Sequence, residues 1–376
     1  MTEEEIEVTI EKLIPGGDGL ARLNGMVVFI PGTLPGEKVR ALVLERKKGW
    51  MKAEISEILQ ASPERRSPFC PLFGECGGCS WQHISYEVQL ESKALFSKEA
   101  LIRQGGFSED EIPDFLLTSS PPEAYRSRIR PQILPDGSAG FHSRGSGNII
   151  PVKSCPVAVP GVNRFLADPP GGVVPGSEPI VFGDAEEYWV ADLNPEARAE
   201  VKGRTFHFPP GAFFQSNLHP LDSLIDFALK DAGRNGTRCG MDLYGGVGLF
   251  GAFLSETFDR VIGVDRDKRA KKYWLRHVGE NGTFHPLSLE NWSRRRIEPK
   301  PDFIIVDPPR TGLSPSIRKV LARLKVPQIS YVSCNPVTQA RDIRELRRAG
   351  YELTDYGVFD LSPQTPHVET VARLSR

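Results

Sequence analysis

The sequence predicts an α/β protein in which a doubly wound sheet in the C-terminal part follows a small β-barrel and an α+β segment. From Phe206 onward, strand-like and helix-like stretches alternate, which is typical of a parallel sheet covered by helices. Residues 6–59 instead hold short apolar runs separated by glycine turns, as in a small barrel. A Ser-Pro-rich stretch, residues 61–68, leads into a cysteine cluster. We therefore expect domains at residues 1–60, 61–204 and 205–376.

The composition is that of an ordinary globular chain. It has 376 residues, 25% of them charged, a net charge of -1 and a mean hydropathy of -0.29. No apolar stretch approaches the ~20 residues that span a bilayer, and the acidic start lacks the features of a signal peptide. We expect a cytoplasmic monomer without a membrane partner. In a reducing compartment the six cysteines are not expected to form disulfides.

The barrel segment contains a basic turn that could contact nucleic acid. Residues 46–52, Arg-Lys-Lys-Gly-Trp-Met-Lys, combine cations with one aromatic ring, which suits phosphate contact and base stacking. A solvated hairpin tip explains the same residues equally well. Because the net charge is close to zero, any surface that binds nucleic acid has to be local.

The middle segment contains four cysteines that are candidates for metal binding: Cys70, Cys76, Cys79 and Cys155. Four thiolates suit either zinc or an iron–sulfur cluster, and the spacing does not decide between them. A structural role is favoured over redox catalysis because the Cys-x-x-Cys pair lies in a glycine-rich loop. Residues 125–130, Tyr-Arg-Ser-Arg-Ile-Arg, alternate like a strand with arginines on one face, a possible phosphate clamp or simply a polar face.

The C-terminal part contains a pattern typical of nucleoside binding. A strand at residues 240–244 ends in the turn Gly245–Gly248, and the next strand closes on Asp265. This turn departs from the dinucleotide fingerprint Gly-x-Gly-x-x-Gly, so a pyrophosphate cradle is poorly supported. Asp242 and Asp265 instead suit an amino group and ribose hydroxyls, which is the class I S-adenosylmethionine arrangement. A NAD-dependent oxidoreductase is the alternative.

Cys334 is the candidate nucleophile. It follows the apolar run of residues 328–332, which predicts a buried strand, and precedes Pro336, which predicts a helix capped by Asn335. Ligands bind at the carboxyl ends of strands in such sheets, and we expect the helix N-terminus to lower the thiol pKa. A small buried hydrophobic residue is the alternative. Glu369, in the later motif His367-Val368-Glu369, is the candidate base.

Five motifs together resemble the RNA uridine-5 methyltransferases: Phe214-Gln215-Ser216-Asn217, residues 242–248, Asp307-Pro308-Pro309-Arg310, Ser333-Cys334-Asn335-Pro336 and His367-Val368-Glu369. Residues 15–21 and 28–37 resemble a TRAM domain, an OB-like RNA-binding barrel. The resemblance implies that Cys334 is the nucleophile and Glu369 the base. It also implies S-adenosylmethionine contacts at Gln215, Tyr244, Asp265 and Asp307, and a [4Fe–4S] cluster on Cys70, Cys76, Cys79 and Cys155, as in the branch that acts on 23S rRNA.

Two positions depart from the family pattern, and alternatives to this function stay open. Leu249 stands where the family often has Asn, and Asp265 where it usually has Glu, so the shorter acid implies a backbone shift or a bridging water. The alternatives are methylation of tRNA or another rRNA, a cytosine-5 methyltransferase, an N-methyltransferase, and an iron–sulfur RNA-binding protein without catalysis. Ser333 stands where cytosine-5 enzymes have Pro or Thr before the cysteine.

Overall fold

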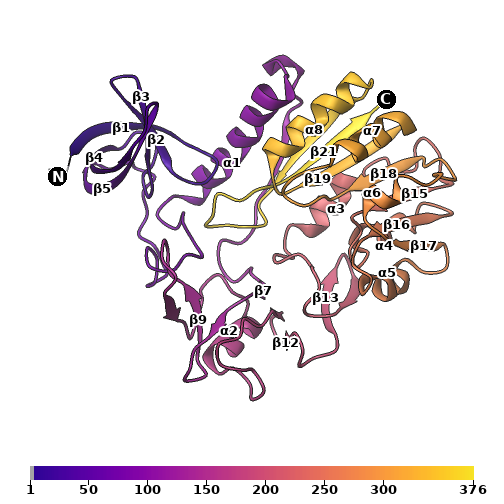
Figure 1. The fold of residues 1–376 in the computed structure, drawn as a ribbon, viewed down its shortest axis with the longest axis horizontal. Helices are drawn as coiled ribbons and strands as arrows, with labels where there is room; N and C mark the ends of the chain where they lie inside the picture. The colour runs from indigo at the N-terminus through magenta and orange to yellow at the C-terminus, as the bar shows by residue number, and fades with distance from the viewer. Residues whose placement is uncertain (1–3) are drawn as a thin grey trace. The chain divides into compact units, whose positions relative to one another are not determined.

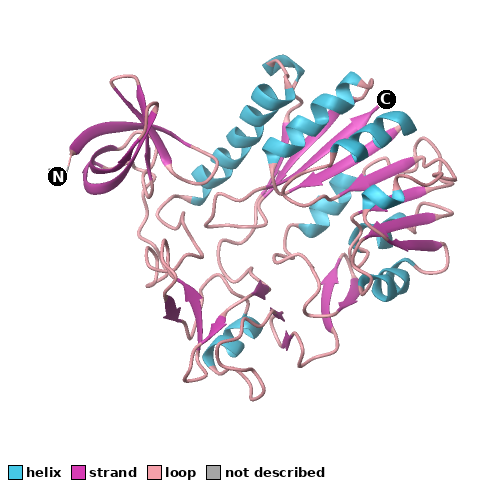
Figure 2. Cartoon of the chain, in the orientation of Figure 1, coloured by secondary structure: helices cyan, strands magenta, loops and turns pink. Residues whose placement is uncertain are grey.

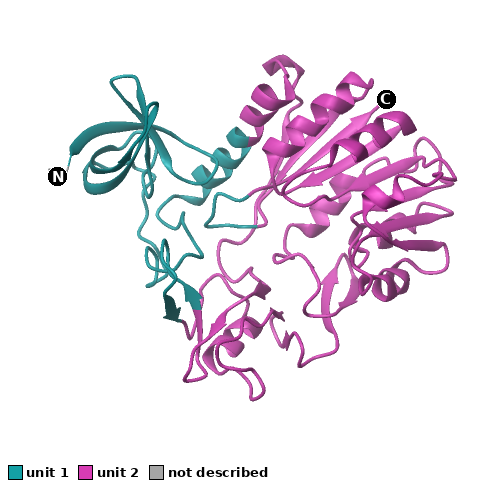
Figure 3. Cartoon of the chain, in the orientation of Figure 1, with its two compact units in different colours: residues 1–96, 141–151, 362–367 teal, residues 97–140, 152–361, 368–376 magenta. Residues whose placement is uncertain are grey.

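The computed structural model describes residues 4–376. The chain divides into two compact units, which Figure 3 distinguishes by colour: one contains residues 1–96, 141–151 and 362–367, and the other contains the remaining ranges 97–140, 152–361 and 368–376. The short range 362–367 comes from near the C-terminus yet belongs to the first unit. The boundaries at 60/61 and 204/205 stay a prediction.

A closed five-stranded barrel forms the start of the first unit, as the glycine-punctuated apolar runs predicted (Figures 1 and 2). Its strands follow the order β1-β2-β3-β5-β4 around the barrel: β1 Glu5–Leu13, β2 Gly19–Leu23, β3 Met26–Ile30, β4 Lys38–Arg46 and β5 Trp50–Gln60. Alternate side chains of β1 are buried, because successive residues of a strand point to opposite faces. Gly19 is required at its position, because a Cβ there would lie 2.0 Å from Thr33 Oγ1.

The middle of the chain consists of short elements. Helix α1 spans Tyr86–Ala100 and is followed by the π-helical turn η1 (Leu101–Gly105) and the 3₁₀ turn η2 (Glu109–Glu111). The short strands and one helix are β7 Arg128–Ile129, β8 Gln132–Ile133, β9 Ala139–His142, β10 Ile149–Pro151, α2 Pro160–Ala167, β11 Val181–Gly183 and β12 Tyr188–Val190. Strands β13 (Ala197–Val201) and β14 (Arg204–Phe208) form an antiparallel pair.

The predicted arginine strand is shorter than expected. Only Arg128 and Ile129 of residues 125–130 lie in a strand. Arg128 is half-buried, and burial lowers the pKa of its guanidinium. Arg130 is instead exposed, and its Nη2 lies 3.1 Å from Glu178 Oε2. The three arginines therefore do not form one uniform exposed row.

An eight-stranded sheet forms the centre of the second unit and confirms the predicted doubly wound fold. Its order is β17-β16-β15-β18-β19-β21-β20-β6, with strands β6 Phe115–Thr118, β15 Gly240–Leu243, β16 Val261–Asp265, β17 Gly282–Pro286, β18 Phe303–Val306, β19 Gln328–Ser333, β20 Glu352–Phe359 and β21 Glu369–Ser375. Strands β15 to β19 run parallel to one another, and β21 is antiparallel to both β19 and β20.

Two apolar clusters cover the two faces of this sheet. Helices α3 (Leu221–Leu229), α4 (Leu249–Leu254) and α5 (Ala270–Val278) contribute to one cluster. Helices α6 (Leu289–Trp292), α7 (Pro315–Leu324) and α8 (Pro336–Arg348) contribute to the other. Strands β16 and β17 follow β15 on one side of it in the sheet, whereas β18 and β19 lie on its other side. The direction in which the chain adds strands therefore reverses at β15. In such sheets the crevice for a ligand opens at the carboxyl ends of the strands at this reversal.

Candidate active site

The glycine turn after β15 is shaped by close packing against Trp274. A Cβ at Gly248 would lie 3.1 Å from the Trp274 ring, and one at Gly263 would lie 2.3 Å from it. Tyr244 has a φ of 65°, in the left-handed region that few non-glycine residues adopt outside functional turns. The turn therefore holds an uncommon backbone conformation at the edge where a ligand is expected.

Asp242 and Asp265 brace this turn from two strands. Asp242 is buried, and its Oδ2 accepts hydrogen bonds from Gly251 N at 3.0 Å and Trp274 Nε1 at 3.2 Å. Asp265 Oδ2 accepts from Gly246 N at 3.0 Å, and its Oδ1 accepts from Asp267 N. Asp242 thus links β15 to helix α4 and to Trp274, and both carboxylate oxygens of the shorter acid Asp265 accept hydrogen bonds from backbone amides.

Three carboxylates lie close enough at this edge to influence one another. Burial and the charges of Asp242 and Asp265 raise the pKa of Asp307 to about 7, and burial together with Asp265 raises the pKa of Asp242 to about 7. Concentrated negative charge repels a diphosphate and favours a cation. This edge therefore suits a cationic ligand better than a diphosphate.

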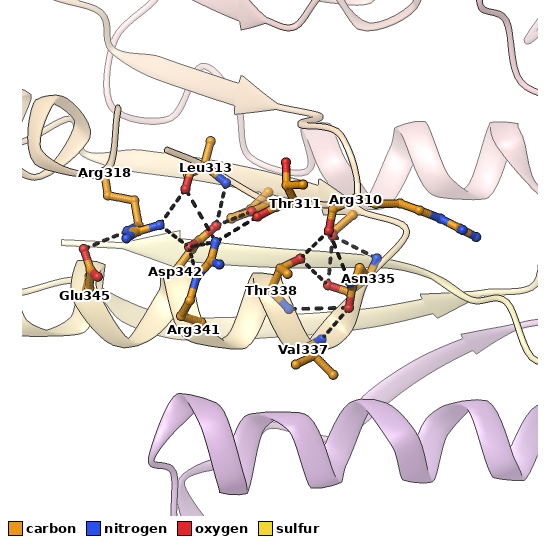
Figure 4. Close-up of polar contacts among 12 residues, drawn as sticks. Arg310, Thr311, Leu313, Arg318, Asn335, Val337, Thr338, Arg341, Asp342 and Glu345 are labelled. Atoms are coloured by element: carbon orange, nitrogen blue, oxygen red, sulfur yellow. Dashed lines mark hydrogen bonds and ion pairs between the residues drawn. The ribbon is translucent and has the colours of Figure 1, made fainter. Parts of the chain in front are cut away.

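The loop that follows Asp307 is clamped by helix α8. Figure 4 shows the Arg310 carbonyl oxygen accepting hydrogen bonds from Asn335 Nδ2 and Thr338 Oγ1, each at 3.1 Å. The Arg310 side chain extends away from these contacts (Figure 4). Farther along the loop, Leu313 N donates to the buried Asp342 carboxylate at 2.7 Å. The backbone of the Asp-Pro-Pro-Arg motif is thereby tied to the helix that begins just after Cys334.

Sheet register brings the two predicted catalytic residues together. Strands β19 and β21 are antiparallel and pair Ser333 with Thr370, so the next residues outward, Cys334 and Glu369, are neighbours across the pair. Thr370 Oγ1 donates to Ser333 O at 3.1 Å and strengthens this junction. Glu369 is buried, whereas Cys334 is half-buried.

Burial and neighbouring carboxylates favour the neutral form of both groups. Burial, then Glu369 and Asp307, raise the pKa of Cys334 to about 11, and only Arg310 opposes them. Burial, followed by Asp307, raises the pKa of Glu369 well above its usual range. The expectation that the helix N-terminus lowers the thiol pKa is therefore wrong. Its first free amides, Val337 N and Thr338 N, are already bonded by the Asn335 side chain, as the predicted cap requires.

The segment around Gln215 supplies an aromatic ring that sequence reasoning missed. Gln215 itself is half-buried, and its neighbour Phe214 is buried and stacks on Phe208 with ring centroids 4.4 Å apart. Phe213 instead exposes 65% of its surface. The run Ala212-Phe213-Phe214 is apolar throughout, so the sequence gives no sign of which ring faces outward.

Each of the four candidate cluster cysteines is half-buried. Among residues 4–376, no three or more His, Cys, Asp and Glu side chains are arranged to hold a metal ion. The iron–sulfur ligand set therefore stays a prediction. No helix within the same described range is long and apolar enough to cross a membrane.

Comparison with known proteins decides the family. Residues 1–55 match the TRAM domain, and residues 298–376 match the family described as tRNA (Uracil-5-)-methyltransferase. An uncharacterized RNA methyltransferase from Treponema denticola is 32% identical, with 97% of each chain aligned. The chain belongs to the RNA (uracil-5-)-methyltransferase family. As a member of this family it is a methyltransferase, so the oxidoreductase alternative is wrong.

Two further relatives of this methyltransferase differ in the RNA that they modify. The 23S rRNA (uracil(1939)-C(5))-methyltransferase RlmD of Aliivibrio fischeri is 29% identical, over 99% of this chain and 97% of the relative. The crystal structure of Pyrococcus abyssi tRNA (uracil-54, C5)-methyltransferase, in complex with S-adenosyl-L-homocysteine, has a TM-score of 0.71. It is 25% identical and covers 98% of this chain and 100% of its own. The fold is thus shared by enzymes for different RNAs.

Proposed function

We propose that this enzyme methylates carbon 5 of a uridine in RNA through a covalent adduct, with Cys334 as nucleophile and Glu369 as base. The observation that carries this proposal is the β19–β21 register, which makes the two residues neighbours at the carboxyl end of β19. A thiol and a buried carboxyl side by side suit a reaction that adds a nucleophile to a base and then removes a proton from it.

The proposed reaction consists of addition to the base, methyl transfer, and proton removal with elimination. After Cys334 and Glu369 have each released a proton to solvent, the Cys334 thiolate adds to carbon 6 of uracil, and the electron pair of the 5,6 double bond becomes an enolate that makes carbon 5 nucleophilic. Carbon 5 would then form a bond to the methyl group of a sulfonium donor, whose sulfur–methyl bond breaks and whose sulfur leaves as a neutral thioether. The Glu369 carboxylate removes the remaining proton of carbon 5, the double bond re-forms and the carbon–sulfur bond breaks, which returns the thiolate.

Arg310 is proposed to favour the charged intermediates. Its charge lowers the pKa of both Cys334 and Glu369, so its guanidinium stabilises the thiolate and the carboxylate alike. Because its backbone is held by α8 while its side chain is exposed, it could also donate to the developing oxygen charge of the enolate.

The carboxyl edge of the sheet is proposed to hold the methyl donor. Gln215, Tyr244, Asp265 and Asp307 would contact S-adenosylmethionine, which when bound supplies an electrophilic methyl group. The clustered carboxylates support this assignment because they favour a cationic ligand. Phe213 is proposed to stack on the extruded base, since its exposed ring offers a face and RNA bases are commonly recognised by stacking after they leave the helix.

A trapping experiment tests the assignment of Cys334 and Glu369. RNA that contains 5-fluorouridine has no proton for the base to remove at carbon 5, so the wild-type enzyme should form a denaturant-stable adduct. Cys334→Ala should form none. Glu369→Gln should accumulate a methylated adduct on normal uridine RNA, because elimination requires the base. An active Cys334→Ala variant would exclude the mechanism and would favour the N-methyltransferase alternative.

We propose 23S rRNA as the substrate. The TRAM match at the N-terminus and the full-length similarity to an enzyme named for 23S rRNA support it. Mapping of 5-methyluridine in ribosomal and transfer RNA, from strains with and without the gene, tests the proposal. Loss of the modification from tRNA alone would contradict it, and labelled methyl in 5-methylcytidine would identify a cytosine-5 enzyme.

We also propose that Cys70, Cys76, Cys79 and Cys155 hold a [4Fe–4S] cluster. The support is their chemistry, since four half-buried cysteines can supply four thiolate ligands, in a chain that resembles the 23S branch. Anaerobically purified protein should contain about four iron and four sulfide per chain by this stoichiometry. A Cys79→Ser variant should lose most of the iron. Stoichiometric zinc in place of iron and sulfide would contradict the proposal.

A further inference from the structure

The loop that leads into Glu369 is locked within the first unit. Residues 362–367 belong to this unit, and Gln364 and Thr365 in the loop are almost completely buried. Gln364 has a φ of 66°, a left-handed conformation that a non-glycine residue keeps only when its surroundings impose it. Val368 and then Glu369, the first residue of β21, follow directly along the chain.

The side chain of Gln89, on helix α1, imposes much of this conformation. Gln89 is completely buried, and its Oε1 accepts from Gln364 N at 2.9 Å while its Nε2 donates to Gln364 Oε1 at 3.0 Å. The same Nε2 lies within hydrogen-bond distance of Trp81 O at 3.1 Å and Ile84 O at 3.0 Å. One amide group therefore holds both the backbone and the side chain of Gln364.

Other groups of the same unit hold the loop at its remaining polar atoms. Gln364 O accepts from Ser80 N and Trp81 N, each at 3.0 Å. Lys93, another buried residue of α1, donates from Nζ to Ser362 O at 3.1 Å. Every one of these contacts constrains the loop, but Gln89 is the one whose two-way pairing fixes the residue with the uncommon φ.

We propose that Gln89 is a positioning residue for the base Glu369, acting through Gln364. This inference rests on the proposed role of Glu369. A short stretch of chain joins the locked residue to the base, so freeing Gln364 lets the start of β21 shift. Small displacements of a catalytic group slow its step strongly, by up to about 100-fold for 1 Å. The step affected is proton removal from carbon 5, which comes after both formation of the carbon–sulfur bond and methyl transfer.

The location of this step gives the proposal a distinctive signature. If Glu369 is misplaced, Cys334 still adds to carbon 6 and carbon 5 is still methylated, but the carbon 5 proton leaves slowly. The enzyme then accumulates as a methylated covalent adduct. Turnover should also become sensitive to deuterium at carbon 5, because breaking that carbon–hydrogen bond becomes rate-limiting.

The test uses full-length Gln89→Met, which keeps the length of the side chain but removes its amide. Gln364→Gly is the second variant, because glycine accepts the positive φ yet loses the paired side chain. We expect turnover to fall about tenfold or more in both, within the range above. The adduct fraction on uridine RNA with a labelled methyl donor should rise severalfold, with a larger deuterium isotope effect.

Gln328→Met is the matched control. Gln328 is also a buried glutamine, at the far end of β19, and its Nε2 donates to Lys230 O at 3.1 Å. It should lower the melting temperature without raising the adduct fraction. Slower turnover of Gln89→Met and Gln364→Gly without adduct or isotope effect, or unchanged turnover, would overturn the inference. Absence of any wild-type adduct with 5-fluorouridine RNA would instead overturn the proposed function itself.

Discussion

Replacement of Asp342 by Asn should destabilise the sheet unit strongly. Asp342 is completely buried on α8, and its carboxylate contacts both Arg318 of α7 and the loop that follows Asp307 (Figure 4). It accepts from Arg318 Nη1 at 2.9 Å, Leu313 N at 2.7 Å and Tyr331 OH at 2.7 Å. Arg318 is itself buried, and Glu345, its other ion-pair partner, is more exposed.

The expected magnitude follows from the charge that is left behind. Removing one member of a buried ion pair costs about 3–5 kcal/mol, because the remaining ion stays out of water without its partner. Asn keeps one carbonyl oxygen, so it can still accept from some of the donors. We therefore expect a loss near the lower limit, about 3 kcal/mol in the free energy of unfolding.

Urea denaturation followed by tryptophan fluorescence measures this loss. The control is Asp226→Asn, whose carboxylate pairs with Lys202 at an exposed position and should contribute less than about 1 kcal/mol. Adding Arg318→Met to Asp342→Asn should recover part of the stability, since this removes a buried guanidinium whose remaining ion-pair partner is the more exposed Glu345. If Asp342→Asn costs no more than the exposed control, the assignment of this ion pair as a buried clamp is refuted.

Three further predictions follow from the site. Alkylation of Cys334 in RNA-free enzyme, measured by peptide mass spectrometry, should still rise with pH above about 9.5, where an ordinary thiol with a pKa of about 8.5 has levelled off, because burial raises the pKa of Cys334 to about 11. A plateau at or below that pH would contradict this prediction. The stability linked to the raised pKa is complete below about pH 8.5 and is lost as the pH rises through about 11. Asp265→Ala should weaken S-adenosylmethionine binding, measured by calorimetry, about tenfold or more. Gly246 N and Asp267 N would lose their acceptor, and an unsatisfied buried donor typically costs about 1–3 kcal/mol. Unchanged affinity would remove Asp265 from the proposed cofactor site. Gly263→Ala should lower the free energy of unfolding by about 1–3 kcal/mol, since its Cβ would lie 2.3 Å from the Trp274 ring, and a neutral effect would show that the ring can move.

The local elements were predictable because their signals are local. The strand before Cys334, the cap at Asn335 and the helix from Pro336 each depend on neighbours within a few residues. The arginine strand failed for the opposite reason, because alternation over six residues does not reveal how few of them find a partner strand. The thiol pKa also failed, since it depends on burial and on Glu369 and Asp307, which approach only in the fold.

The sequence by itself determined the order of barrel, cysteine segment and doubly wound sheet, because the periodicity of each segment is a local property of the chain. It also identified Cys334 and Glu369 as candidates, because each lies in a short motif. Only the tertiary structure decided that these two residues are neighbours, since antiparallel register between β19 and β21 is a non-local pairing. It alone also revealed that Gln89 holds Gln364, a contact between residues 275 positions apart. Such contacts leave no trace in local pattern, because the partners meet only after the chain between them has folded.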